Sequence, residues 1–179
     1  MSGRTGKERI MFELKRITPE AIPRALAKAE RYRLLNEPEE AESICEDVLR
    51  IDPDNQQALV MLLLAITDNF ARGGRIDRAR ELLPRLKDSY EQAYYGGIIC
   101  ERWAKTQFDP NRSSPFVDNP IREAMSLYEK AVQLSPPGND DAVLRWNACV
   151  RFIQSSPQLG AGAEDWSNDA CFRDDVSPR

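Results

Sequence analysis

Apolar residues recur along the chain at offsets of three and four, which is the spacing of one helical face. This spacing predicts a helix from about Ile22, just after the start signal Thr18-Pro19, and a second helix that Pro38 opens. Turn-forming residues then separate further helices, at 52–55 and at Gly73-Gly74. The apolar positions of the first four predicted helices are Ala25, Ala29 and Tyr32; Ala41, Ile44, Cys45, Val48 and Leu49; Leu59, Leu62, Leu63 and Ile66; and, from about Asp77, Ala79, Leu82, Leu83 and Leu86.

The second half of the chain predicts three more helices and one long loop. A fifth helix is expected over about 89–106, and residues 105–120 contain three prolines without a helical period, which predicts a loop. A sixth helix follows and ends before Pro136, and a seventh covers about 140–153. The expected buried positions are Ala124, Tyr128 and Ala131 in the sixth helix and Val143, Trp146 and Val150 in the seventh.

Two segments share one spacing of small and bulky residues. Ala41 precedes Pro53 by twelve residues, and Ala124 precedes Pro136 by the same number. The pattern also includes Ala29 and Tyr32 upstream, and Cys45, Val48, Tyr128 and Ala131 between each alanine and its proline. It resembles the tetratricopeptide repeat of about 34 residues. Ala79-Leu83-Leu86 resembles a weaker copy, and Gly97 and Cys100 would take the small-residue and tyrosine places of the fifth helix.

The resemblance covers about residues 22–153, as about three repeats followed by a C-terminal cap helix. It implies an all-α fold, a right-handed array of antiparallel helical hairpins. In this family the first helix of each hairpin lines a concave groove that usually holds a peptide or a helix of a partner protein. The candidate partner-binding residues carried over by position are Leu26, Glu30, Arg33, Gln57, Val60, Leu64, Tyr94, Ile98 and Glu101. Core packing is the alternative interpretation of the apolar ones.

One family subtype binds the terminal carboxylate of heat-shock chaperones, and we do not expect that function here. The subtype needs two lysines, an arginine and two asparagines on its inner helices, whereas Leu26, Glu30 and Met61 occupy the places of a lysine and both asparagines.

Composition narrows the remaining function classes. The 179 residues have a formal net charge of −4, which does not suggest the basic stripe of a nucleic-acid-binding protein. The chain has no histidine, so Ser-His-Asp and Cys-His catalysis and HExxH zinc sites are excluded. We therefore expect no enzyme activity, no cofactor and no metal. Cys100 and Cys149 would be the nucleophiles of an enzyme, but neither has a histidine to activate it.

Cysteine usage and the chain ends suggest where the protein works. The four cysteines are scattered without a CxxC pair, no apolar run is long enough for a membrane span, and the N-terminus does not resemble a signal peptide. We expect a cytoplasmic protein without membrane contact. The predicted organisation is an arm or short helix over 1–17, a helical domain over 18–154 and a disordered acidic tail over 155–179.

Two segments leave alternatives open, and so does the function of the whole chain. Phe108 and Phe116 of the predicted loop dock either on the helices or on a partner. Trp166 and Phe172 of the acidic tail belong either to a solvated segment or to a short binding motif that occupies the chain's own groove. For the whole chain, the leading hypothesis is a non-catalytic adaptor or scaffold that binds another protein. The alternative is a self-assembling structural or accessory subunit, a homo-oligomer whose interface is the edge of the array.

Overall fold

The computed structural model describes residues 12–109, 115–156 and 159, and over these residues it is all-helical, without a strand. The α-helices are α1 (Ile22–Leu34), α2 (Pro38–Ile51), α3 (Gln56–Asp68), α4 (Ile76–Arg80), α5 (Ser89–Gln107), α6 (Pro115–Leu134) and α7 (Asp141–Gln154). Short 3-10 turns cover Pro19–Ala21, Phe70–Arg72 and Leu83–Arg85. Within the described ranges, none of these helices is long and apolar enough to cross a membrane.

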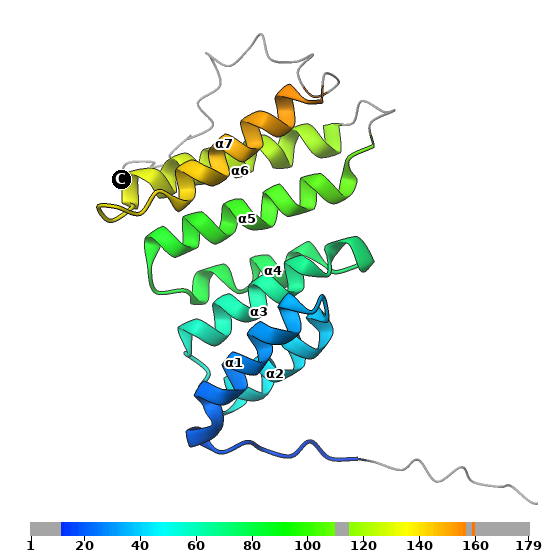
Figure 1. Ribbon diagram of the computed structural model, residues 1–179, viewed down its shortest axis with the longest axis vertical. Helices are drawn as coiled ribbons and strands as arrows, with labels where there is room; N and C mark the ends of the chain where they lie inside the picture. Colours follow the sequence, from blue (N-terminus) through cyan, green and yellow to red (C-terminus); the bar gives the residue numbers. More distant parts are fainter. Residues whose placement is uncertain (1–11, 110–114, 157–158, 160–179) are drawn as a thin grey trace, which may run out of the picture.

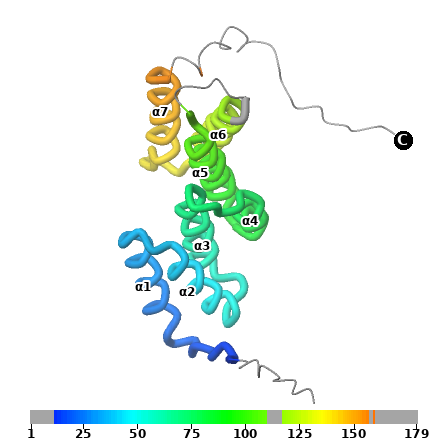
Figure 2. The backbone as a smooth tube through the Cα atoms, turned by 90° about the vertical axis from the view of Figure 1, so that its right-hand side faces the viewer, coloured from blue at the N-terminus to red at the C-terminus, as the bar shows by residue number. Residues whose placement is uncertain are grey.

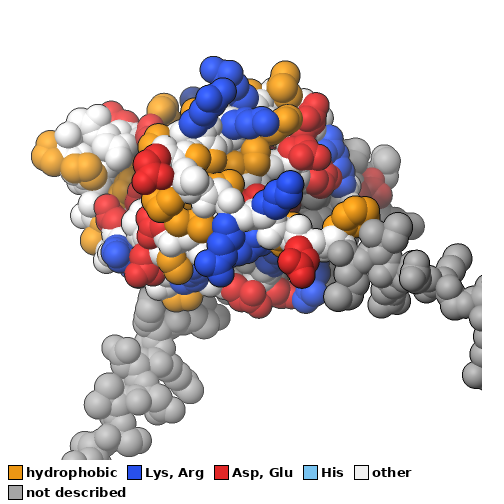
Figure 3. All heavy atoms as spheres, turned by 90° about the horizontal axis from the view of Figure 1, so that it is seen from below, with side chains coloured by type: hydrophobic (Ala, Val, Ile, Leu, Met, Phe, Trp, Pro, Cys, Tyr) orange, Lys and Arg blue, Asp and Glu red, His pale blue; other side chains and the backbone are white. Residues whose placement is uncertain are grey.

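Consecutive helices pack side by side and form a stack along the long axis of the molecule (Figure 1). Helices α1 and α2 form one end, which faces the viewer in Figure 3, and α6 and α7 form the other. The tightest pairing joins α5 to α6, and α3 packs on both α2 and α1. Seen from the side, α1 and α7 project toward the same side, α3 and α5 are set back between them, and α4 and α6 lie opposite (Figure 2).

Local capping interactions explain where several helices begin. The side chain of Asn55 accepts a hydrogen bond from the backbone N–H of Ala58 at 2.9 Å, and Asp88 accepts one from Tyr90 at 2.8 Å. Such caps satisfy backbone donors that have no partner inside the helix. Pro38 begins α2, where its missing N–H costs nothing. The sequence-based starts of these helices are confirmed.

Two apolar clusters make up most of the core. The first joins α1 through α5, and the second joins α5, α6 and α7. The expected interior positions Ala124, Tyr128 and Ala131 are confirmed, since each is fully buried. Gly97 lies against the Tyr128 ring, so this position needs a small residue.

The prediction of one continuous fourth helix was wrong. Ala79, Leu82 and Leu86 are buried as expected, but α4 ends at Arg80 and a separate 3-10 turn follows. Pro84 explains the break, because proline has no N–H to donate and its ring clashes with the carbonyl group four residues earlier, which is that of Arg80.

The prediction of a loop over 105–120 was wrong at its C-terminal end. Helix α6 already begins at Pro115, and Val117 and Ile121 are 1% exposed, so the apolar face of the helix extends further toward the N-terminus than expected. Phe108 packs edge-to-face on Phe152 of α7, with ring centroids 5.0 Å apart. Of the two open alternatives for Phe108, docking on its own domain is the one observed. Residues 110–114 and the side chain of Phe116 lie outside the described part.

Helix α7 is rotated relative to the predicted inner face. Val143 and Trp146 are each 37% exposed, whereas Ala142 and Cys149 are buried. The small side chains let α7 approach its neighbours closely, because Ala142 clusters with Ala93 and Ala131. Val150 is partly buried against the second cluster, as expected.

The structure describes only part of the two chain ends for which the sequence makes predictions. Residues 12–18 form no helix, and residues 1–11 lie outside the described part. Trp166 and Phe172 of the predicted acidic tail also lie outside it.

Candidate functional site

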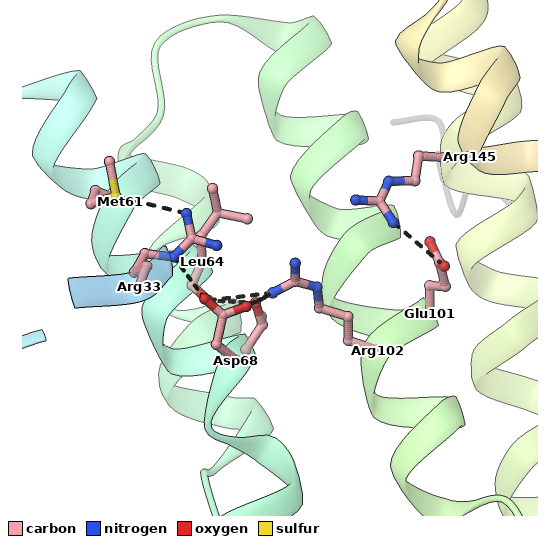
Figure 4. Close-up of polar contacts among 8 residues, drawn as sticks. Arg33, Met61, Leu64, Asp68, Glu101, Arg102 and Arg145 are labelled. Atoms are coloured by element: carbon pink, nitrogen blue, oxygen red, sulfur yellow. Dashed lines mark hydrogen bonds and ion pairs between the residues drawn. The ribbon is translucent and has the colours of Figure 1, made fainter. Parts of the chain in front are cut away.

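A single carboxylate connects three helices on one face of the stack. Asp68, the last residue of α3, lies between Arg33 of α1 and Arg102 of α5 (Figure 4). The Arg33 Nε donates to Asp68 Oδ2 at 2.7 Å, and Arg102 Nη1 donates to Asp68 Oδ1. Arg102 Nη1 also donates to the hydroxyl of Thr67 at 2.7 Å. We call Arg33, Asp68 and Arg102 the Asp68 bridge.

A second polar cluster joins α5 to α6 and α7. Glu101 is 1% exposed, and its carboxylate accepts hydrogen bonds from Tyr128 Oη at 2.6 Å and Lys105 Nζ at 2.5 Å. Arg145 Nη1 of α7 lies 3.7 Å from the same carboxylate (Figure 4). Burial and the Glu101 charge both raise the pKa of the Tyr128 hydroxyl, so it stays protonated and donates. A buried carboxylate is tolerated here because it is paired and hydrogen-bonded.

Two apolar residues of α3 border the Asp68 bridge. Met61 and Leu64 are partly buried against the core, Arg33 Nη1 lies 3.8 Å from Met61 Sδ, and Arg102 Nη1 lies 3.5 Å from the Leu64 carbonyl oxygen. A hollow of about 310 Å³ opens beside the bridge and is lined by Glu30, Arg33, Leu34, Asn36 and Asp68. Each guanidinium has five N–H donors, more than one carboxylate can accept. The face therefore combines apolar contact area with donors suited to a carboxylate or a backbone carbonyl.

The structure brings only some of the nine candidate residues to this face. Arg33 and Leu64 lie together at the bridge (Figure 4). Glu30 lines the adjacent hollow and is exposed, and Val60 is partly buried on α3. Gln57 is exposed in the first turn of α3. The nine candidates remain a prediction, and these five are the ones we carry forward.

The other four candidates occupy different places. Leu26 is 3% exposed in a cluster with Val48 and Ala58, and Ile98 is 2% exposed in the α5–α7 core. Their side chains do not reach the surface, so we leave them out of the proposed face. Glu101 is likewise enclosed in its ion-pair cluster. Tyr94 is half-buried and stacks on Tyr90, with centroids 5.6 Å apart.

Sequence reasoning missed Asp68, Arg102 and Arg145. A signal for two of them was present, because Arg33 and Asp68 are 35 residues apart and Asp68 and Arg102 are 34 apart. Opposite charges at this constant spacing would place an ion pair between α1 and α3 and another between α3 and α5, if these helices are equivalent members of the predicted repeat. No such spacing leads to Arg145.

The described cysteines are poorly suited to nucleophilic chemistry. Burial raises the pKa of Cys45 and Cys149 to about 12 and that of Cys100 to about 11, so these thiols are protonated near neutral pH. Within the described residues, no group of three or more Asp, Glu, Cys or His side chains could hold a metal ion.

Comparisons with known proteins do not identify a family for this chain. No protein-family model matches the chain. A search of curated proteins finds no match either. The resemblance to tetratricopeptide repeats therefore rests on the sequence pattern alone.

Proposed function

We propose that this chain is a non-catalytic protein-interaction module, an adaptor or scaffold, built as a right-handed array of tetratricopeptide-like hairpins. Helices α1, α3 and α5 begin at Ile22, Gln56 and Ser89, which are 34 and 33 residues apart. This interval supports the repeat, whose length is about 34 residues. We further propose that the partner-binding face is formed by these three helices.

The Asp68 bridge is the observation that carries the proposal. It ties α1, α3 and α5 to one another and holds two guanidinium groups beside the partly buried Met61 and Leu64. A surface that is already ordered loses little conformational freedom when it binds. The face suits a peptide or helix that places an apolar side chain against α3 and a carboxylate or carbonyl oxygen near the arginines.

We also propose a cytoplasmic location. Cys45, Cys100 and Cys149 are free and buried, as is common for thiols in a reducing compartment. The net charge of −4 favours a protein partner over a nucleic acid.

Photo-crosslinking from defined positions tests the proposed face. A photoreactive amino acid is placed at Glu30 or Gln57, which are exposed on α1 and α3, and the chain is exposed to light in the cells that produce it. The expected result is the same crosslinked protein from both positions. A partner that contacts both α1 and α3 lies across the Asp68 bridge, next to Leu64. Leu64→Arg should therefore remove the crosslinked products from both positions.

Matched positions on the other side of the stack serve as controls. Glu81, just after α4, and Ser126 of α6 are exposed, and Figure 2 places α4 and α6 opposite α1 and α7. The photoreactive group at Glu81 or Ser126 should not capture this protein. Equal capture from all four positions, or no capture at Glu30 and Gln57, would contradict the proposed face.

A further inference from the structure

The α1 end of the stack exposes a basic surface. A hollow of about 610 Å³ is lined by Arg24, Ala27, Lys28, Arg31 and Tyr32 of α1 and by Leu35, which directly follows the helix, and we call it the α1 surface. Arg24, Lys28 and Arg31 are exposed at helical spacing, and Leu35 is 66% exposed. Viewed from this end, Lys and Arg side chains lie among hydrophobic and acidic ones (Figure 3). None of the residues that line this hollow is acidic.

The opposite end exposes an apolar groove with an acidic residue. Glu129 and Val132 of α6 and Val143 and Trp146 of α7 line a hollow of about 190 Å³, which we call the α6–α7 groove. Val132 is 40% exposed, and Val143 and Trp146 are 37% exposed each. Glu129 is the charged residue among the four.

Both surfaces lie where the stack stops. Inside the stack each helix is covered by the helices that precede and follow it, and arrays of this kind need their terminal faces shielded. After α7 the structure describes only Ser155, Ser156 and Leu159, and Leu159 packs on the second apolar cluster, which does not include Trp146. The rotation of α7 places Val143 and Trp146 outward, where a next helix would pack.

We propose that the α1 surface of one copy docks into the α6–α7 groove of a second copy, head to tail. The two surfaces are complementary, since the first offers three cations and an exposed leucine and the second a carboxylate and an apolar groove. Leu35 supplies the side chain that fills the groove beside Val143. Lys28 and Arg31 face Glu129, and a cation over the Trp146 ring adds further attraction.

This contact is heterologous and uses opposite ends of the stack, so copies add to one another as an open chain. Each added copy leaves one free α1 surface and one free groove, and the assembly lengthens with concentration. One helix face in one groove buries less than the roughly 1,600 Å² of a standard stable interface, so the association is weak. Salt weakens it further, because the paired charges are exposed. The proposal does not rest on the partner-binding face, which uses a different stripe of α1.

Sedimentation velocity of the full chain tests this assembly. The wild-type mass should rise from the monomer value of 20.4 kDa with concentration at low salt, and fall back at high salt. Lys28→Glu/Arg31→Glu blocks the α1 surface, and Glu129→Lys/Trp146→Ala blocks the groove. Each variant alone should stay monomeric. An equal mixture should form a dimer and stop there, because one intact surface and one intact groove remain.

Controls and contrary outcomes are equally specific. Arg75→Glu/Lys87→Glu makes the same charge change as the α1 variant. Both residues are exposed but line neither the α1 surface nor the α6–α7 groove, so this variant should still assemble. Far-UV circular dichroism confirms that every variant is folded. Three results would overturn the proposal. The first is a wild-type chain that is monomeric at all concentrations. The second is assembly that is lost only in the α1 variant, as for an α1–α1 contact, and the third is assembly that is lost only when residues 160–179 are deleted.

Discussion

Gly97 of α5 lies directly against the ring of Tyr128 on α6. A Cβ atom on residue 97 would be 2.5 Å from Cε1 of that ring, closer than real contacts allow. The ring is fully buried, and its hydroxyl donates to Glu101 at 2.6 Å, so it cannot withdraw without losing that hydrogen bond. The close pairing of α5 and α6 therefore depends on glycine at this position.

Gly97→Ala should lower the free energy of unfolding by about 1–3 kcal/mol, the usual cost of overpacking a core. Alanine favours a helix by about 1 kcal/mol relative to glycine, but this gain is smaller than the cost of displacing a buried ring. Urea denaturation followed by circular dichroism measures the change. Gly96→Ala is the matched control, because its Cβ would be 3.3 Å from the movable Cδ1 of Leu127. Equal losses in both variants would argue against the ring contact as the cause.

The buried carboxylate of Glu101 gives a second prediction. Tyr128→Phe removes one donor and should cost about 1–2 kcal/mol of stability. Glu101→Ala should cost about 3–5 kcal/mol, because it leaves the Tyr128 hydroxyl without its acceptor and removes the counter-ion of Arg145 and Lys105. Since both changes act on one contact, the double variant should lose less than the sum. Additive losses in urea denaturation would show that the residues are not coupled.

The Asp68 bridge can be tested by removing its shared acceptor. Asp68→Ala should lower the free energy of unfolding by about 1–3 kcal/mol, because Arg33 and Arg102 lose a common, partly buried partner. Asp47→Ala provides the comparison. Asp47 pairs with Arg50 within one helix, and the side chains of that pair are 31% and 36% exposed. Such pairs contribute about 0.3–0.5 kcal/mol. If Asp68→Ala costs no more than Asp47→Ala, the bridge does not hold the helices together.

The buried thiols predict a loss of stability at alkaline pH. Burial raises the pKa of Cys149 from 9.0 to about 12. Below pH 9 the thiol is protonated in both the folded and the unfolded chain, so its contribution is constant. Between pH 9 and about 12 only the unfolded chain releases the proton, so stability falls by up to about 1.4 kcal/mol per pH unit for this group.

Removing the thiol should remove its share of that slope. The free energy of unfolding of Cys149→Ala should therefore fall less steeply above pH 9 than that of the wild type, whatever the variant loses through packing at lower pH. Urea titrations at a series of pH values measure both slopes. Parallel curves would mean that the folded chain releases this proton as readily as the unfolded chain does.

Local sequence signals predicted those parts of the fold that local physics decides. The caps at Asn55 and Asp88 and the opening proline Pro38 act within a few residues, so the starts of α2, α3 and α5 could be located. The rotation of α7 could not be predicted in the same way. It depends on the buried Glu101, which attracts Arg145, and on small side chains of other helices against which Ala142 packs.

The candidate site was predictable to a similar extent. Arg33 was identified from its place on the first helix, whereas Asp68 and Arg102 were missed because their contacts join residues of different helices that are 34 or 35 residues apart in the sequence. Position in a repeat does not distinguish a buried side chain from an exposed one. Leu26 and Ile98 therefore looked like groove residues although both are core residues.

The Asp68 bridge also determines how a partner can be recognised. A carboxylate that approaches Arg33 or Arg102 finds each guanidinium already paired with Asp68. Such a partner can use the N–H donors that Asp68 leaves free, but Asp68 already balances part of the positive charge, so the net electrostatic gain is small. Affinity must then come mainly from the apolar side chains around Met61 and Leu64, while the arginines decide where on the face the acidic group sits. Because Asp68 already pairs with both arginines, the apolar contacts set how tightly a ligand binds and the arginines set how it is aligned.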